Sequence, residues 1–250
     1  MRAEIVTGAV FPDYELTDHA GKRRELSELQ GPDPMILVLS RGGYCPKDRR
    51  QAEGLVQLHH EMEVGYSRLV TISTDNMLLT NEYRDGVGAH WSFLSDPGRK
   101  VQKDLDIAEY TDPEHDPMIP HVIVLEPGLV VFKIYNGYWF FGRPTIEELR
   151  QDLRAVLKKC RPDWDITTPE LKTAWGRGEH DRFYPYGKTY GQSAISLRFL
   201  SLLSVAVFLM HSSGADLPFQ WTALVVLAPR RGCAFSGKSE LQETGSWKRS

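Results

Sequence analysis

The chain has 250 residues, of which 41% are hydrophobic and 25% are charged, a composition typical of a soluble globular protein. Its formal net charge of −3 gives no general electrostatic reason to bind nucleic acid or an anionic membrane surface. We therefore expect small molecules and thiol-bearing partners, and no nucleic acid.

Strands and helices alternate up to about Cys160. In chain order we predict a strand at 35–40, a helix at 47–64, a strand at 68–73, a helix at 76–85, a short strand at 93–94, a helix at 99–105, strands at 121–125 and 130–135, and a helix at 145–159. Thr145 followed by Glu148 predicts a capping box at the start of the last helix. This order requires an α/β fold in which helices cover both faces of a central mixed sheet, a thioredoxin-like three-layer sandwich.

The composition changes after Lys159. We predict a domain at 1–165, an irregular C-terminal extension at 166–192 that is rich in Trp, Tyr, Gly and Pro, and a separate tail at 193–250. The apolar runs of the tail, 197–210 and 221–228, are shorter than the roughly 20 residues that span a bilayer, so we expect no membrane contact by the tail. An amphipathic helix, a membrane-associated hairpin, and sequence that does not fold or is artefactual stay open as alternatives for it.

The cysteines indicate an intracellular setting. Cys45, Cys160 and Cys233 are too few and too widely spaced for a secreted disulfide framework or a zinc site. The first residues also lack the apolar stretch of a signal peptide. We therefore expect the reduced cytoplasm and no metal.

Cys45 lies where an apolar strand ends and a helix is predicted to begin. Pro46 suits the first helical position, so Cys45 falls at or beside the N-cap and its sulfur can face unpaired N–H groups of the first turn. Those donors and nearby cations such as Arg41 could lower the pKa of a thiol from about 8.5 by roughly two, which makes the nucleophilic thiolate abundant at neutral pH. The alternative is a buried, inert cysteine.

Several segments resemble peroxiredoxins of the alkyl hydroperoxide reductase and thiol-specific antioxidant family. The resemblance spans roughly residues 5 to 165 and rests on segments in the family's order, namely 8–22, 26–29, the strand that leads into Cys45-Pro46, Leu94-Ser95-Asp96-Pro97 with Val101, and 141–149. It implies a cytoplasmic antioxidant enzyme that reduces hydroperoxides and supports cell redox homeostasis.

By this resemblance Cys45 is the peroxidatic cysteine, which a hydroperoxide oxidises to a sulfenic acid. Cys160, in Cys160-Arg161-Pro162-Asp163-Trp164, is similar to the resolving cysteine whose disulfide crosses a homodimer in that family. The alternative is a helix-end cysteine without a redox role. Asp48 stands where a thioredoxin-type motif has its second cysteine, so no such dithiol is present. The implied reductant is of the thioredoxin or glutathione type, and no metal, haem or flavin cofactor is implied.

The chain departs from the family at its active-site donors. Val38 and Gly42 stand where the family has Pro and Thr, and the family's arginine ahead of the strand at His121 is missing. Arg41, Arg143, or the backbone N–H groups of Gly42 and Gly43 are candidates to replace these donors to a developing oxyanion. For either arginine the alternative is a solvated surface side chain.

Met118-Ile119-Pro120-His121 resembles the thioredoxin cis-proline segment, which would place Pro120 against Cys45 in the substrate site; an ordinary turn proline is the alternative. The acidic segment 112–116 is predicted to be a solvated loop, and a cation site is the alternative.

The leading hypothesis is a thiol-dependent peroxidase. A thiol–disulfide oxidoreductase without strong peroxidase activity and a non-catalytic thioredoxin-like binding module are the alternatives.

Overall fold

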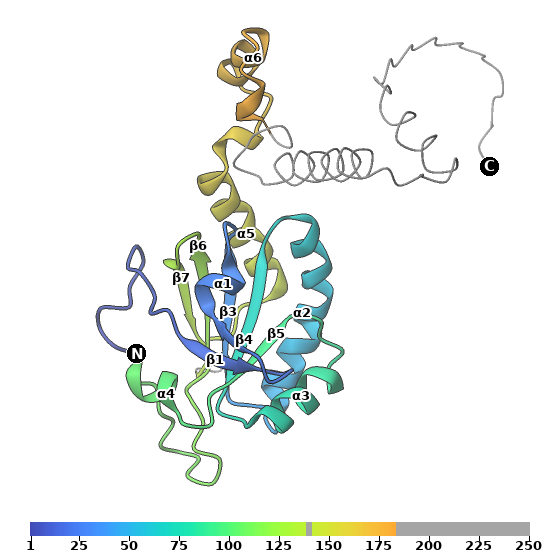
Figure 1. The fold of residues 1–250 in the computed structure, drawn as a ribbon. Coiled ribbons are helices and arrows are strands. Elements are labelled where there is room, and N and C mark those ends of the chain that lie inside the picture. Colours follow the sequence, from blue (N-terminus) through green and yellow to red (C-terminus); the bar gives the residue numbers. More distant parts are fainter. Residues whose placement is uncertain (139–141, 184–250) are drawn as a thin grey trace, which may run out of the picture. The chain divides into compact units, whose positions relative to one another are not determined.

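The computed structural model describes residues 1–138 and 142–183 (Figure 1). Residues 1–177 form one compact unit, which is separate from the residues that follow. Cys233 and the predicted tail at 193–250 lie outside the described residues. Within the described ranges, no helix is both long enough and apolar enough to cross a membrane.

A mixed sheet of seven strands forms the centre of this unit, in the order β2-β1-β5-β4-β3-β6-β7. The strands are β1 (Glu15–Asp18), β2 (Arg23–Glu25), β3 (Met35–Ser40), β4 (Arg68–Ser73), β5 (Ser92–Ser95), β6 (His121–Glu126) and β7 (Val130–Asn136). β3 pairs in parallel with β4 and antiparallel with β6, so it lies in the interior of the sheet. All six residues of β3 are buried, which is typical of a strand covered on both faces.

The helices connect these strands (Figure 1). They are α1 (Leu26–Gln30), α2 (Pro46–Val64), α3 (Met77–Gly86), α4 (Lys100–Asp104), α5 (Ile146–Cys160) and α6 (Pro169–Gly176), with short 3-10 helices at Pro162–Trp164 and His180–Arg182.

Alternating side chains of β3 enter two separate cores. Met35, Leu37 and Leu39 pack with residues from α1, α4 and the N-terminal segment. Ile36 and Val38 pack with the apolar faces of α2 and α5 and with Tyr83 of α3. Because successive side chains of a strand point to opposite faces, one apolar strand builds both cores, and the predicted three-layer fold is confirmed.

All nine predicted elements are present, and their ends match the predictions or differ from them by one residue. The structure adds β1, β2 and α1, whose short and mostly polar sequences carry little hydrophobic periodicity. The prediction of an irregular segment at 166–192 is wrong in part, because α6 forms there. Thr168 caps α6 by accepting a hydrogen bond from the N–H of Leu171, and Pro169 starts the helix.

The capping box at α5 gives a stability prediction. The Thr145 side chain accepts from the Glu148 N–H, and the Glu148 carboxylate accepts from the Thr145 N–H at 2.7 Å. We expect Thr145→Ala to lower the free energy of unfolding by about 1 kcal/mol in urea denaturation, since it leaves a first-turn N–H without its acceptor. Thr145→Ser keeps the oxygen and serves as the control; equal losses in both variants would contradict this role for the hydroxyl.

Candidate active site

The end of β3 and the start of α2 place Cys45. Ser40 ends the strand, and Cys45 is the N-cap residue of α2, with Pro46 in the first turn. The Cys45 N–H donates to the Gly42 carbonyl at 3.2 Å, which closes the turn between strand and helix. The predicted position of Cys45 at the mouth of a helix therefore agrees with the structure.

Two glycines in this turn are required by space. Gly42 has φ +120°, in the region that favours glycine, and a Cβ there would lie 2.6 Å from Oδ2 of Asp75. A Cβ on Gly43 would lie 2.9 Å from Cβ of Tyr83. Any side chain at either position would push the Cys45 turn away from β4 and α3.

The N–H groups of these glycines already have acceptors. Gly42 donates to Oγ of Ser40 at 3.1 Å, and Gly43 donates to Oδ2 of Asp75 at 2.9 Å. An N–H that is engaged within the protein is not available to an oxyanion, so we correct the prediction that Gly42 and Gly43 bind substrate. Their role is to let the turn close.

The Cys45 sulfur meets a guanidinium rather than the helix amides. Cys45 is 2% exposed, and Nη1 of Arg41 donates to its sulfur at 3.9 Å. The Cys45 side chain makes no capping hydrogen bond to the first turn of α2, which corrects the expectation that the amides would hold the thiolate. Arg41 therefore places a positive charge in contact with the sulfur.

Two carboxylates hold Arg41 in this position. Nε lies 2.8 Å from Oε2 of Glu109, and Nη2 lies 3.1 Å from Oδ2 of Asp112. Burial opposes the charged guanidinium, but the neighbouring Tyr44, Glu109 and Cys45 raise the pKa of Arg41 overall. Arg41 is thus a fixed cation rather than a solvated surface side chain.

Asp112 also holds the residue that precedes the cysteine. The Tyr44 hydroxyl donates to Oδ2 of Asp112 at 2.8 Å, and the Tyr44 ring stacks on His115 with centroids 3.7 Å apart. Hydrogen bonds from His115, and next from Tyr44, lower the pKa of Asp112 to about 2. The segment predicted to be a solvated loop is therefore tied to the Cys45 turn.

Asp48, one turn into α2, joins three parts of the site. Its Oδ2 accepts the Arg41 N–H at 2.7 Å and the Ser40 hydroxyl at 3.1 Å, while its Oδ1 accepts from Nη2 of Arg143. Nη1 of Arg143 donates to the Gly137 carbonyl at 3.2 Å. Arg143 thus reaches the site, but it braces the turn through Asp48 instead of contacting the sulfur.

Pro120 lies at the same edge of the sheet as the Cys45 turn. It is buried and directly precedes His121, which is paired with Leu39 of β3. Its carbonyl accepts the Gly137 N–H at 2.8 Å, so it also adjoins the segment that carries Arg143.

The family model described as AhpC/TSA family matches residues 7–133. The chain belongs to the AhpC/TSA family. The predicted resemblance is confirmed, and this membership supports thiol peroxidase or redoxin chemistry in general. No curated protein sequence matches the chain.

Solved peroxiredoxin structures share the fold of this AhpC/TSA chain. Peroxidoxin BcpB from Mycobacterium tuberculosis is 20% identical with a TM-score of 0.52, and the match covers 61% of this chain and 96% of that one. PrxQ from Xylella fastidiosa, solved as a mutant, is 14% identical with a TM-score of 0.53 and coverages of 62% and 98%. AhpC from Enterococcus faecalis is 13% identical with a TM-score of 0.52 and coverages of 60% and 90%. At these identities the comparisons show the fold alone.

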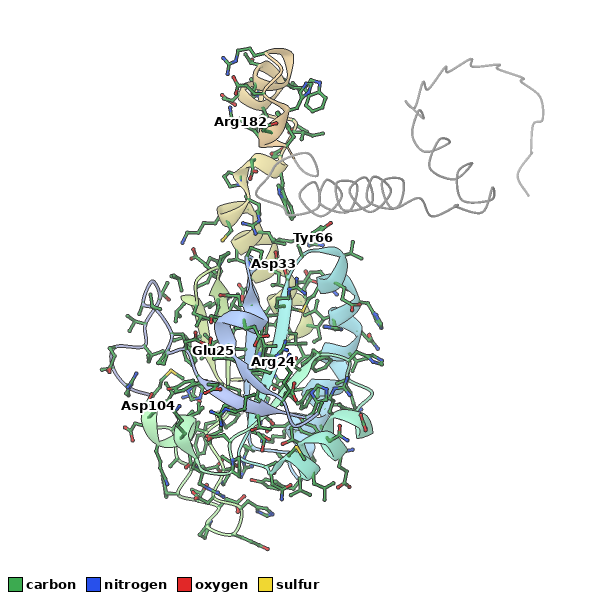
Figure 2. All side chains as sticks on the ribbon, viewed as in Figure 1. Arg24, Glu25, Asp33, Tyr66, Asp104 and Arg182 are labelled. Carbon is green, nitrogen blue, oxygen red and sulfur yellow. The ribbon has the colours of Figure 1, made fainter. Side chains whose placement is uncertain are left out.

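Cys160 lies at the opposite end of the sheet from Cys45. Cys160 is the last residue of α5. Lys159, just before it, pairs with Glu126 at the far end of β6. Arg161, just after it, contacts the Pro32 carbonyl and Asp33, which directly precede β3. Figure 2 shows Asp33 and Tyr66 at this end of the sheet. The six residues of β3 rise by roughly 17 Å, whereas a disulfide needs Cα atoms within about 7 Å. Cys45 and Cys160 of one chain are therefore too far apart to bond in this arrangement.

Four residues of the AhpC/TSA site were missed by the sequence analysis: Tyr44, Asp75, Glu109 and His115. Asp75 follows the end of β4, at the carboxyl edge where sites form in such sheets, and that signal could have found it. No local sequence pattern marks Glu109 or His115 as part of a site. Among the described residues no group of three or more metal-binding side chains comes together.

Replacing Asp75 tests the half-buried carboxylate beside Gly43. Burial raises the pKa of Asp75, and the hydrogen bond from the Gly43 N–H offsets this only in part. A carboxyl group whose pKa is raised in the folded state destabilises the fold when it ionises. This loss of folding free energy is absent below the pKa of the unfolded state and is complete once the pH has risen through the pKa of the folded state.

We therefore expect Asp75→Asn, which keeps an oxygen for the Gly43 N–H, to be more stable than the wild type at pH 7 and equally stable near about pH 3. The measurement is urea denaturation at both pH values. A stability difference that does not change with pH would contradict this account.

Proposed function

We propose that the chain is a thiol-dependent peroxidase that reduces hydroperoxides through Cys45. The observation that carries this proposal is the contact between the Arg41 guanidinium and the Cys45 sulfur at the N-cap of α2. A cation beside a cysteine stabilises the thiolate relative to the thiol, and the thiolate is the nucleophile. Membership of the AhpC/TSA family supports this chemistry in general, and the role of Cys45 is the proposed detail.

In the first step the Cys45 thiolate attacks one oxygen of the peroxide. A sulfur–oxygen bond forms as the oxygen–oxygen bond breaks, so sulfur is oxidised to the sulfenic acid and the peroxide is reduced. The other oxygen leaves as hydroxide or alkoxide and takes a proton to become water or alcohol. Negative charge passes from sulfur to the leaving oxygen, so the site needs a donor near both atoms.

Arg41 is the donor that the geometry favours for this charge. Its Nη1 is already directed at the sulfur, and its remaining contacts keep it there. We propose that Arg41 replaces two donors of the family, the hydroxyl at the position held here by Gly42 and the arginine ahead of the strand at His121. Arg143 acts indirectly, because its partner Asp48 fixes the backbone N–H of Arg41.

Burial of the sulfur sets a condition on this reaction. With Cys45 at 2% exposure, a peroxide meets the sulfur only when neighbouring side chains move aside, and Arg41 is the side chain in direct contact with the sulfur. Tyr44 is 38% exposed and Arg41 is partly exposed, so both lie on the solvent side of the site.

We propose that Cys160 of a second copy of the chain resolves the sulfenic acid. Its thiol would attack the oxidised Cys45, form a disulfide between chains and release water, and a thioredoxin- or glutathione-type thiol would reduce that disulfide. Burial, and next Glu126, raises the pKa of Cys160, so it favours the thiol form until it is brought to Cys45. The distance across the sheet supports a partner chain over the same chain as the source of this thiol.

Peroxide consumption tests the proposed activity. We expect the wild type to consume hydrogen peroxide or an organic hydroperoxide and to form a sulfenic acid on Cys45 that dimedone traps, since the thiolate is the attacking group. Cys45→Ser should abolish both signals. Cys160→Ser is the matched control and should keep the trapped sulfenic acid. Peroxide consumption equal in wild type and Cys45→Ser would overturn the proposal.

Non-reducing electrophoresis after mild oxidation tests the resolving step. We expect a disulfide-linked dimer whose peptides map to Cys45 and Cys160, and its loss in either serine variant. A Cys45–Cys160 bond within one monomer would contradict the geometry, because the two residues lie at opposite ends of β3.

Thiol–disulfide exchange is the second candidate, and the position of Pro120 favours it. Pro120 lies at the same sheet edge as Cys45, where an extended partner segment could align with the start of β6. In this case Cys45 would form mixed disulfides with protein or glutathione and would consume little peroxide. A non-catalytic binding module would show neither activity and an ordinary Cys45 thiol.

A further inference from the structure

Each of the three nitrogens of the Arg41 guanidinium has a different partner. Nη1 faces the Cys45 sulfur at 3.9 Å, Nη2 donates to Asp112 at 3.1 Å, and Nε lies 2.8 Å from Oε2 of Glu109. A guanidinium is planar, so holding two of its nitrogens fixes the direction of the third. The two carboxylates therefore decide where Nη1 points.

Glu109 is the more firmly held of the two carboxylates. It is 7% exposed, its N–H donates to the Pro117 carbonyl at 3.0 Å, and its Oε1 accepts from the Thr111 hydroxyl at 2.8 Å. The adjacent bridge between Ala108 and Met118 closes the base of the loop. Asp112, by contrast, has a partly exposed side chain that is shared with Tyr44 and His115.

The contact between Arg41 and Glu109 is ionic. Nε and Oε2 are both buried, and neither makes a hydrogen bond with good geometry within residues 1–138 and 142–183, although they lie 2.8 Å apart. Attraction between buried opposite charges is strong, and neither atom has an alternative partner to satisfy it. Oε2 of Glu109 therefore fixes the position of Nε of Arg41.

We propose that Glu109 is a positioning residue that turns the Arg41 guanidinium toward the Cys45 sulfur. The inference rests on the proposed function, because it assigns Glu109 a part in activating the same cysteine. Within the part of the chain that the structure describes, the charged or titratable groups near the guanidinium and the sulfur include Glu109, Asp112, Tyr44 and, from α3, Tyr83, and Asp48 holds the Arg41 backbone.

Positioning and simple charge repulsion predict opposite results. A carboxylate that acted only through its negative charge would disfavour the thiolate, so its removal would make Cys45 more reactive. A carboxylate that orients Arg41 has the reverse effect, because without it the guanidinium turns away from the sulfur and the thiolate loses its nearest cation.

The decisive variant is Glu109→Asp, which keeps the charge and shortens the side chain by one methylene. The measurement is the rate of Cys45 alkylation by iodoacetamide as a function of pH, with the full chain carrying Cys160→Ser and Cys233→Ser so that one thiol reports. We expect alkylation at pH 6.5 to slow several-fold in Glu109→Asp and on the order of tenfold in Glu109→Ala.

Glu114→Asp is the matched control, since Glu114 is exposed on the same loop, and it should alkylate like the parent. Unchanged or faster alkylation in Glu109→Asp would overturn the proposal, even if Glu109→Ala did not fold. Because the assay contains no peroxide, its outcome is independent of the peroxidase test: a parent chain without peroxidase activity refutes the proposed function, whereas an unaltered Cys45 in Glu109→Asp refutes the role of Glu109.

Discussion

The active-site turn depends on the buried carboxylate of Asp48. This side chain accepts from Ser40 at the end of β3, from the backbone of Arg41, and from the Arg143 guanidinium, while its own backbone belongs to α2. A buried carboxylate is costly unless it is fully partnered, so the strand end, the turn and the segment before α5 must come together around it. Cys45 lies between two of these anchored points, which fixes its place at the start of the helix.

The groups around the Cys45 sulfur alternate in charge with distance from it. Arg41 faces Cys45, Glu109 and Asp112 face Arg41, and Tyr44 and His115 cover Asp112. Such a chain keeps a cation beside a nearly buried thiol without leaving that cation unpaired. It supports the proposal that Arg41 takes the place of the hydroxyl and arginine of the family motif, with the cation supplied by the turn itself and oriented by a loop more than sixty residues further along the chain.

The central sheet separates the two described cysteines. Cys45 follows the carboxyl end of β3, and Cys160 ends a helix near the amino end of that strand. Any direct chemistry between them requires two chains or a large rearrangement. This separation supports the proposal that the thiol that resolves an oxidised Cys45 comes from a second copy of the chain.

Local sequence determined most of the helices and strands and the position of Cys45 at the start of a helix. The apolar run of β3, the Pro46 start of α2 and the Thr145 box depend on near neighbours, so the three-layer fold and the N-cap position of Cys45 could be predicted. β1, β2 and α1 escaped prediction because their form comes from packing rather than periodicity. Only the tertiary structure decided what surrounds the sulfur: hydrogen bonds to Ser40 and Asp75 occupy the glycine amides, and long-range ion pairs with Glu109 and Asp112 direct Arg41. Electrostatic contacts act through space between distant parts of the chain, so no local pattern encodes them.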